Sequence, residues 1–352
     1  MLLEDLEYGG TQRQTLELAS RLNRERFEPR LVTLRRGPMD LEGEARSLGL
    51  SCRVLTDRDS FEPLAVLPAL WRYLRRDRPP LLHLLTALPN IWGRVLGRPL
   101  RLPGIIASCR GLASVRNQHE RRLGKMARVH ICNAEAIREQ LVNSVGLPAE
   151  RVIHIPNGVN VDFFSPAETE RDEPALLCVA RMAKVKNHPM LLRAFAEVLA
   201  SFPEASLHLL GEGGGKDAIR ELASAPDLRG RVVMHPGSQD VRPYLHMAQI
   251  FVLSSDFEGT PNALLEAMSC GLPVIATRTG GNAEAVQHEK NGLLVPCGDA
   301  GAMARAMLRL LNRPGERIEF GRAGRESVVN HYSMRAMVRA HEAVYEHVLG
   351  MK

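Results

Sequence analysis

The stretch DFEGTPNALLEAM at residues 256–268 decides the fold that we expect for this chain. It follows an apolar run at residues 250–255 and leads into CGLPVIAT at residues 270–277, where a Gly-Leu-Pro turn precedes a second apolar run. The order of strand, polar loop, helix, turn and strand is typical of βαβ units and a parallel sheet. We expect the helix to begin at Pro261, with Thr260 as its N-cap.

The same alternation of short apolar runs and amphipathic stretches extends in both directions from this segment. The second half predicts strands at residues 176–180, 206–210, 232–234, 250–254, 274–277 and 293–295, with a helix at residues 189–200. The first half predicts helices at residues 11–22 and 67–76 and strands at residues 30–34, 81–84, 105–108, 129–133 and 152–156.

This pattern predicts an α/β protein made of two Rossmann-like domains whose parallel sheets face each other across a cleft. A chain of 352 residues fits two domains of ordinary size. The expected divisions are an N-terminal acceptor-side domain at residues 1–160, a linker at residues 161–174, a C-terminal donor-binding domain at residues 175–332, and a last helix at residues 333–352 that packs back on the first domain.

The glutamates Glu258 and Glu266 flank the loop and the start of the predicted helix. In open α/β sheets ligands bind beyond the carboxyl ends of the strands, and this loop begins where a predicted strand ends. The backbone N–H groups of residues 259–262 suit an anionic phosphate. Glu266, about 7 Å along the helix, can accept both hydroxyls of a ribose, and Glu258 is expected to point toward a sugar. Taken singly, each glutamate also fits an ordinary solvated position.

A second candidate cluster is the pair of cations Arg181 and Lys186, which lie just after the predicted strand at residues 176–180. An arginine can form a two-pronged contact with a diphosphate, and a lysine adds a mobile point charge. Each charge-assisted hydrogen bond contributes roughly 1.5–3 kcal/mol. The two residues therefore predict a diphosphate clamp that also neutralises a leaving group.

These elements together resemble the large family of retaining glycosyltransferases called family 4, which have the GT-B fold. The most specific part is residues 258–277, similar to the family's paired glutamates and the strand after them. The stretches IPNGVN at residues 155–160 and GGNAE at residues 280–284 are similar as well, and the resemblance covers nearly the whole chain.

The resemblance implies transfer of a hexose-type sugar from a nucleoside-diphosphate sugar, with UDP as the expected nucleotide, to a polysaccharide, a lipid-linked intermediate or another glycan. It further implies retention of configuration, no metal and no other cofactor. By similarity, Arg181 and Lys186 hold the pyrophosphate, Glu266 holds the ribose and Glu258 holds the sugar. The implied donor-binding residues are Arg181, Lys186, Glu266, Gly259, Thr260, Pro261, Asn262, Gly211, Gly9 and Gly10, with Glu258 and His83 in catalytic roles.

Two places in the first half depart from the family pattern. His83, with Asn90, Gly93 and Arg94 downstream, resembles a segment lining the acceptor side, but the second histidine common in the family is replaced by Leu85. A buried core histidine is the alternative for His83. Only eight residues precede the Gly-Gly pair at residues 9–10, so the first strand is very short or begins upstream.

Other motifs fit less well. The D-x-D of residues 57–59, which metal-dependent transferases of another fold use to bridge a diphosphate, lies in an early polar loop. The sequence GEGGGKD at residues 211–217 has the wrong spacing for a P-loop, and Asp217 replaces the Ser or Thr that would hold Mg²⁺. We expect it to be a turn lining the nucleotide pocket. Two other functions stay open: a non-catalytic two-domain binding protein and a nucleotide-sugar epimerase of the same fold.

The distribution of charge along the chain and the content of aromatic residues indicate which kinds of partner to expect. Residues 1–165 hold 25 Lys and Arg against 18 Asp and Glu, whereas the remainder holds 21 against 22. This basic half, with a predicted basic helix at residues 116–128, fits contact with an anionic membrane surface or a phosphorylated acceptor, and a solvated arginine-rich face is the alternative. Only 5% of residues are aromatic and no nucleic-acid motif is present, so we expect no nucleic-acid partner.

The six cysteines are scattered and predict neither zinc nor disulfides. No apolar run approaches the roughly 18–20 residues of a membrane span. Because Glu4 and Asp5 stand where a signal peptide would carry Lys or Arg, we expect a cytoplasmic protein, peripheral at the inner face of the membrane.

Overall fold

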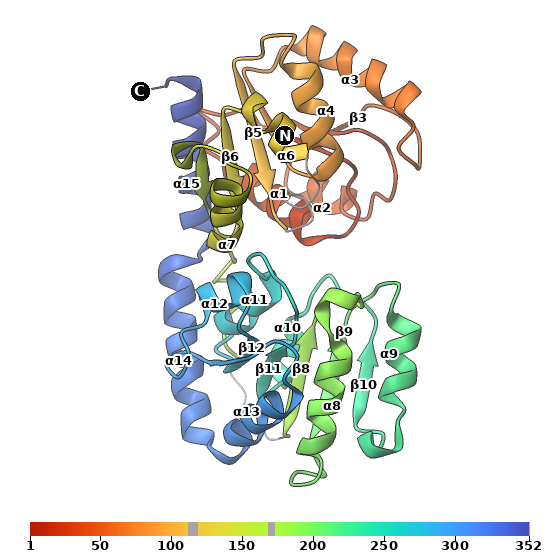
Figure 1. Cartoon of the computed structure of the whole chain (residues 1–352), viewed down its shortest axis with the longest axis vertical. Coiled ribbons are helices and arrows are strands. Elements are labelled where there is room, and N and C mark those ends of the chain that lie inside the picture. Colours follow the sequence, from red (N-terminus) through yellow and green to blue (C-terminus); the bar gives the residue numbers. More distant parts are fainter. Residues whose placement is uncertain (112–118, 168–172, 352) are drawn as a thin grey trace. The chain divides into compact units, whose positions relative to one another are not determined.

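The computed structural model describes residues 1–111, 119–167 and 173–351, which form two compact units. Unit 1 comprises Met1–Gly158 and the C-terminal segment that begins at Met334, and unit 2 comprises Val159–Ser333. The chain therefore crosses between the units twice, at Gly158–Val159 and at Ser333–Met334 (Figure 1).

Unit 1 is built on a seven-stranded parallel sheet in the order β3-β2-β1-β4-β5-β6-β7. Its strands are β1 (Leu2–Leu3), β2 (Leu31–Thr33), β3 (Cys52–Val54), β4 (Leu81–Leu84), β5 (Gly104–Cys109), β6 (Val129–Cys132) and β7 (Val152–His154). The first strand has two residues, both fully buried, and Leu2 lies opposite Val32 in β2 and Leu84 in β4. The apolar side chains of Leu2 and Leu3 thus place β1 at the centre of the sheet despite its length.

Helices cover both faces of this sheet. They are α1 (Gly10–Arg21), α2 (Glu42–Ser47), α3 (Pro63–Asp77), α4 (Ala87–Gly97), α6 (His119–Leu123), α7 (Glu135–Glu139) and α15 (Met334–Leu349), with short turns η1 (Gly124–Met126), η2 (Gln140–Ser144) and η3 (Ala149–Arg151). Residues 116–118 of the predicted basic helix lie outside the described residues, and the rest of that stretch forms α6 and η1.

The last helix, α15, belongs to the core of unit 1. Its side chains Met337, Val344, Tyr345 and Val348 are buried in one cluster with residues of α1, β5 and β6. Apolar residues recurring every three or four positions give the helix one buried face, and the burial of that face fixes the C-terminal segment on unit 1.

Unit 2 is built on a six-stranded parallel sheet in the order β10-β9-β8-β11-β12-β13. The strands are β8 (Ala175–Val179), β9 (Ser206–Leu210), β10 (Val232–His235), β11 (Ile250–Leu253), β12 (Val274–Thr277) and β13 (Leu293–Val295). The helices are α8 (His188–Val198), α9 (Lys216–Ala223), α10 (Arg242–Met247), α11 (Asn262–Ser269), α12 (Gly280–Ala285), α13 (Ala300–Asn312) and α14 (Pro314–His331), with turns η4 (Lys184–Lys186) and η5 (Pro226–Leu228).

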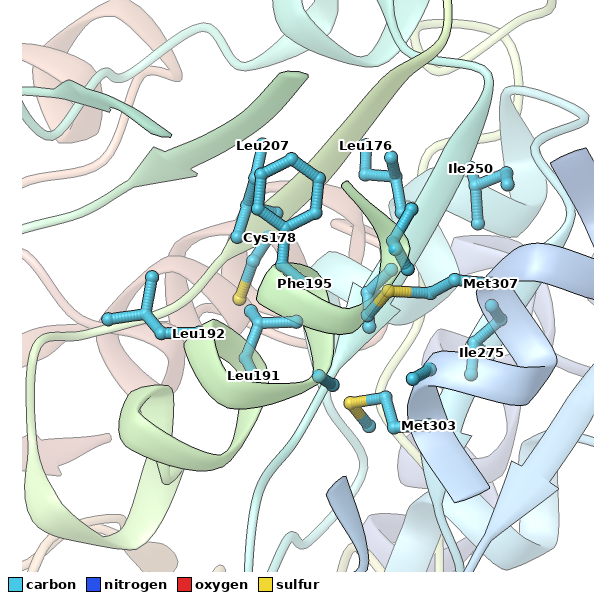
Figure 2. Close-up of a cluster of buried hydrophobic side chains, with 14 of the residues drawn as sticks. Leu176, Cys178, Leu191, Leu192, Phe195, Leu207, Ile250, Ile275, Met303 and Met307 are labelled. Atoms are coloured by element: carbon cyan, nitrogen blue, oxygen red, sulfur yellow. The ribbon is translucent and has the colours of Figure 1, made fainter. Parts of the chain in front are cut away.

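The core of unit 2 is continuous across one face of this sheet. Figure 2 shows α8, represented by Leu191 and Phe195, and α13, represented by Met303 and Met307, against the apolar side chains of the central strands. Because both faces of the strands are covered, their sequences read as unbroken apolar runs rather than alternating ones. That burial holds the strand ends, and the loops that follow them, in fixed positions.

Two local predictions differ from the structure. Helix α11 begins at Asn262, and Pro261, with extended backbone angles, takes the N-cap position, so Thr260 is not the cap. The proline ring fixes φ and the residue contributes no N–H, which makes it suitable next to a helix start. The predicted linker includes residues 168–172, which lie outside the described residues, while Phe164 is already packed into the core of unit 2.

Candidate active site

The two sheets each have one place where the strand order reverses. In unit 2 the chain runs outward from β8 through β9 to β10 and then returns to β11 on the other side of β8. In unit 1 the equivalent reversal lies between β1 and β4. Ligands of open α/β sheets bind at the carboxyl ends of the strands beside such a switch point. The residues that follow β8 and β11 are therefore the first candidates.

Lys186, which follows β8, and Glu258, which follows β11, meet at the switch point of unit 2. The Nζ atom of Lys186 donates to Oε1 of Glu258 at 2.5 Å, and the Ser255 hydroxyl donates to the same oxygen at 2.6 Å. Both charged side chains are largely buried, with exposed fractions of 17% and 9%. The pair brings together two residues that the sequence assigned to different parts of the donor.

The loops that carry these residues are joined by backbone contacts. The Ser254 hydroxyl donates to the carbonyl of Lys186 at 2.8 Å, and the Asp256 N–H donates to the carbonyl of Val185 at 2.8 Å. The amide of Asn187 donates to Asp256 at 2.7 Å, while its own side-chain oxygen caps the start of α8. The site is thus fixed by contacts between the two loops as well as by the contact of Ser255 with Glu258 within one of them.

The glycines Gly280 and Gly281 allow a third loop to approach. A Cβ atom on Gly281 would lie 2.1 Å from the carbonyl oxygen of Gly259, and one on Gly280 would lie 1.9 Å from that of Glu258. Both distances are far below any van der Waals contact, so only glycine permits this packing. The loop after β12 therefore supports the backbone of residues 258–259 directly.

The cation Arg181 differs from Lys186. Its side chain is exposed, and its guanidinium makes no ion pair or hydrogen bond with the described residues of unit 2. The backbone beside it is tightly packed, since a Cβ on Gly211 would lie 2.1 Å from the carbonyl oxygen of Ala180. A charged group on a rigid backbone with no internal partner is suited to an external anion.

The remaining donor-side residues line the turn and first helix that follow β11. Thr260 and Glu266 are 6% and 7% exposed, and Glu266 lies in the second turn of α11. Nearby, burial and the charge of Lys186 lower the pKa of His188 to about 4, and burial raises the pKa of the Cys178 thiol to about 12. Neither neighbour is therefore charged at neutral pH, so these two residues add no charge beside Arg181, Lys186 and the glutamates.

In unit 1 the Gly-Gly pair lies at the switch point. Gly9 caps α1 with extended backbone, and Gly10 is the first helical residue after β1. From the β4 side, the Thr86 hydroxyl accepts the N–H of Glu4 at 3.0 Å, which joins the loops that follow the two strands. The structure thus puts this pair where a ligand of unit 1 is expected.

His83 lies inside β4 and is 1% exposed. Its Nδ1 is 2.8 Å from the Tyr345 hydroxyl and its Nε2 is 2.8 Å from the Ser108 hydroxyl, so both ring nitrogens are engaged. Burial lowers the pKa of His83 well below its usual value. A cavity of about 340 Å³ touches His83, but its other walls include Met1 and Pro80, at the amino ends of the strands. This arrangement favours the core-histidine alternative.

Arg94 also has an internal role. It is fully buried, and its guanidinium donates to both oxygens of Glu120 at 2.7 and 2.9 Å. Among the described residues, one group of three possible metal ligands lies close together, namely Cys109, Glu120 and His130. Because Arg94 already occupies both carboxylate oxygens and brings a positive charge, this group is a poor metal site. The D-x-D aspartates at positions 57 and 59 are exposed.

The structure adds one residue that the sequence did not single out. Arg110 is the first residue after β5, and Nη1 donates to the Asn157 side chain at 3.0 Å. In the described part of unit 1 no carboxylate pairs with it, and residues 112–118 contain no Asp or Glu. Burial lowers the pKa of Arg110 to about 10. Its signal in the sequence, one arginine after an apolar run, is too common to be selective.

Comparisons with known proteins agree with this layout. Residues 8–163 match the family model described as Glycosyltransferase Family 4, and residues 173–313 match the one described as Glycosyl transferases group 1. The two matched segments correspond to the main parts of unit 1 and unit 2.

Curated relatives align over part of their length. The chain is 32% identical over 216 residues to the lipopolysaccharide core biosynthesis glycosyltransferase LpsE of Rhizobium meliloti, covering 60% of this chain and 62% of that protein. It is 29% identical over 234 residues to a GDP-mannose-dependent alpha-(1-6)-phosphatidylinositol monomannoside mannosyltransferase of Mycolicibacterium smegmatis, covering 61% of each. The chain thus spans about three fifths of the length of these relatives.

Among solved structures, that of Anabaena Alr3699/HepE in complex with UDP-glucose matches with a TM-score of 0.86, covering 98% of both chains at 16% identity. At this identity the match concerns the fold, which is GT-B. With both halves matched by glycosyltransferase family models, the chain belongs to the family 4 glycosyltransferases.

Proposed function

We propose that this protein transfers a hexose-type sugar from a nucleoside-diphosphate sugar to a glycan or lipid-linked acceptor, with retention of configuration and without a metal. The observation that carries the proposal is the arrangement at the β8–β11 switch point. There a buried Lys186–Glu258 pair lies beside an exposed Arg181 that has no counter-charge in the described part of unit 2. The relatives' names, which include GDP-mannose dependence and lipid acceptors, are consistent with it.

The donor diphosphate is assigned to Arg181 and Lys186. Glu258 neutralises Lys186 in the structure, so a diphosphate would compete with this carboxylate for the ammonium group. In the described part of unit 2 Arg181 has no such competitor, and it provides the first contact. Two cations of this kind can offset the charge of a departing diphosphate, the part played by a metal in other transferases.

The sugar and the nucleoside are assigned to the two glutamates. Glu258, released from Lys186, can accept hydroxyl hydrogens of the sugar, and the carboxylate of Glu266 can accept those of the ribose. The backbone of residues 259–262 and Gly211 complete the donor side. We assign UDP as the nucleotide, which matches the ligand bound in the Anabaena structure.

For the chemical step we propose departure and attack on the same face of the sugar. The bond from the anomeric carbon to the diphosphate oxygen breaks, a bond to the acceptor oxygen forms on that face, and the acceptor's proton moves to the diphosphate. This sequence retains configuration without a protein nucleophile. An inverted anomeric centre, determined by NMR of the product, would rule it out.

The acceptor is assigned to the carboxyl edge of the unit 1 sheet, where Arg110 follows β5. Gly9 and Gly10, which follow β1 at the same edge, stay assigned to the donor phosphate. A partly buried guanidinium with no carboxylate partner in the described part of unit 1 is costly unless an anion neutralises it. Arg110 therefore supports an acceptor that carries a phosphate or carboxylate group. We further propose that the protein is cytoplasmic and meets the inner face of an anionic membrane through unit 1.

Helices in the described residues do not combine the length and apolar character that a membrane span needs.

The donor assignment is tested by a thermal-shift titration of the purified protein with UDP, GDP, ADP and CMP. Wild type should be stabilised by one diphosphate, and Arg181→Ala and Glu266→Ala should lose that shift. Arg322→Ala, an exposed arginine on α14, is the matched control and should respond like wild type. Unchanged responses of the Arg181 and Glu266 variants would place the donor elsewhere.

Two further assays separate the alternatives. Incubation with the donor sugar alone detects an epimerase, because that enzyme converts the donor with no acceptor present. A binding protein would show the thermal shift but no transfer to any acceptor. Sugar transfer that continues in the presence of a chelator would support the metal-independent mechanism.

A further inference from the structure

Helix α3 has two different faces. Its inner face carries Val66, Leu70, Tyr73 and Leu74, all buried against the sheet and α4. This face accounts for the packing of the helix on unit 1. A helix at the surface is then expected to present polar residues to water on the opposite side.

The outer face instead presents apolar side chains. Leu64 is 95% exposed, the highest value among the large apolar residues of the described chain, and Trp71 is 36% exposed. Pro68 is exposed between them, so residues spaced three or four apart form one outward apolar stripe. Neighbouring apolar side chains on one exposed face mark a docking surface more often than a solvated one.

Arginines follow this stripe toward the C-terminal end of α3 and in the turn after α4. Residues 63–101 hold seven arginines and one aspartate, and of these arginines only Arg94 is buried in an ion pair. The six exposed ones are Arg72, Arg75, Arg76, Arg78, Arg98 and Arg101. The aspartate, Asp77, lies near Arg53 at 3.6 Å and is only partly exposed.

The two parts of this basic surface are contiguous. The Nη2 atom of Arg78 donates to the carbonyl of Leu100 at 3.2 Å, which joins the end of α3 to the turn after α4. Figure 1 shows α3 and α4 as neighbours within unit 1, both in orange. We call the set of Leu64, Pro68, Trp71 and these six arginines the α3 surface.

Helix energetics do not account for the whole α3 surface. Arginines in the last turn interact favourably with the helix dipole, which explains Arg75 and Arg76. The dipole explains neither an almost fully exposed Leu64 nor the arginines at positions 98 and 101. Leucine and tryptophan beside a dense set of arginines match the composition of helices that lie in the interface of a bilayer.

The position of the helix in the fold fits a membrane-bound acceptor. Because α3 follows β3 and leads into β4, its first turn, with Leu64, lies toward the carboxyl edge of the sheet. That is the edge to which the acceptor is assigned. A bilayer under α3 would therefore lie near the place where an acceptor is bound.

We propose that the α3 surface docks on an anionic phospholipid bilayer, with Leu64 and Trp71 entering the interface and the arginines contacting lipid phosphates. The proposal rests on the proposed function, because it places the acceptor in or on a membrane. It moves the membrane contact away from the predicted basic helix at residues 116–128 to a different segment, α3 and the turn after α4.

The test is co-sedimentation of the full chain with vesicles of phosphatidylcholine alone or mixed with phosphatidylglycerol. Wild type should bind the anionic vesicles, bind the neutral ones weakly, and lose affinity as salt is raised. Arg72→Gln with Arg75→Gln should weaken binding roughly 30-fold, since each arginine near an anionic surface contributes about fivefold. Leu64→Ser with Trp71→Ala should weaken it as well.

Matched controls come from unit 2. Ile318 on α14 is 72% exposed, and Arg322 is an exposed arginine on the same helix. Ile318→Ser and Arg322→Gln should bind vesicles like wild type. Wild-type affinity in both α3 variants, or no binding of the wild type to anionic vesicles, would overturn the proposal.

Two more readouts complete the experiment. The chain has two tryptophans, so Trp92→Phe leaves Trp71 as the only reporter, and its emission should shift to the blue on anionic vesicles. An RNA oligomer is added as a competitor for the anionic vesicles. If the RNA displaces the vesicles and the Leu64 and Trp71 variant still binds them like wild type, the surface is a nucleic-acid surface and the proposal is contradicted. The α3 variants should show the same UDP thermal shift as wild type. If UDP does not stabilise the wild type, that result counts against the donor assignment and not against the α3 surface.

Discussion

The Nζ atom of Lys186 lies 2.5 Å from Oε1 of Glu258, across the point where the strand order of unit 2 reverses. The two residues are 72 positions apart in the chain, and the Ser255 hydroxyl holds the same carboxylate oxygen. An internal anion thus occupies the ammonium group that a diphosphate would use. In the proposed donor complex the diphosphate replaces the Glu258 carboxylate as the partner of the Lys186 ammonium group.

This exchange predicts opposite effects of Glu258→Gln on binding and on turnover. UDP should bind at least as tightly as to wild type, because Lys186 loses its competing carboxylate. Sugar transfer should fall about 10²–10³-fold, the usual loss when a preorganised polar group at the reacting centre is removed. Thermal shift with UDP and initial rates of transfer measure the two effects. Glu319→Gln, on the exposed face of α14, should change neither, and weaker UDP binding by Glu258→Gln would contradict the exchange.

Gly281→Ala should destabilise unit 2 by about 2 kcal/mol or more, because the new Cβ would lie 2.1 Å from the Gly259 carbonyl oxygen and the backbone must move. The displacement should also reduce the UDP shift, since the backbone of residues 259–262 is assigned to the donor. Urea unfolding measures the stability. Gly315→Ala is the control, as its Cβ would meet nothing within 4 Å. Equal stability of the two variants would show that the close approach is absent.

Buried histidines predict a loss of stability in acid. Burial, with a smaller effect of Lys186, lowers the pKa of His188 to about 4, and burial lowers that of His341 to about 4. Because both native values lie below the unfolded value of about 6.5, the unfolded chain binds more protons between these pH values. Stability should therefore be full above pH 6.5 and fall as the pH drops toward 4, by roughly 3 kcal/mol per histidine.

Urea midpoints measured between pH 7 and pH 4.5 test this slope. His188→Gln should flatten it, because the variant has no group to protonate on unfolding. His347→Gln, at an exposed position of α15, should leave it unchanged. A His188 variant with the wild-type slope would mean that this histidine titrates normally in the folded protein.

Arg110→Met should separate stability from function. Removal of a partly buried charge with no carboxylate partner in the described part of unit 1 should leave the free energy of unfolding unchanged or increase it. The KM for an anionic acceptor should rise by about tenfold or more, as expected when a charge-assisted hydrogen bond is lost. The UDP shift should not change. Arg151→Met, an exposed arginine of the same unit, is the control, and a destabilised Arg110 variant would indicate a structural role.

The fold was largely predictable because buried parallel strands are short apolar runs. The runs predicted at residues 206–210, 274–277 and 81–84 coincide with β9, β12 and β4. The start of α11 was predicted one residue early, since Pro261 is compatible with both the cap and the first turn. β3 was not predicted, because Cys52–Val54 lies at the edge of the sheet and is only partly buried, so its apolar signal is weak.

The side-chain partners of the site were less predictable. The sequence brings Lys186 and Glu258 into one site but says nothing of a bond between them, which depends on β8 and β11 being neighbours. For His83 the residue type alone fits both a ligand contact and a core position. Its partners, Ser108 and Tyr345, are 25 and 262 residues away, and no local pattern reveals such contacts.

The double crossing of the chain has a consequence for biosynthesis. Unit 1 needs α15, whose Tyr345 and Val348 pack against residues of α1 and β5, yet α15 is translated only after all of unit 2. During elongation, unit 2 has its complete set of strands while the apolar groove for α15 on unit 1 is still open. Unit 1 is therefore begun first during synthesis, but its folding can be completed only after unit 2 has been made. A ribosome-stalled chain ending near Ser333 would carry a finished unit 2 and an unfinished unit 1, a state that chaperones can recognise.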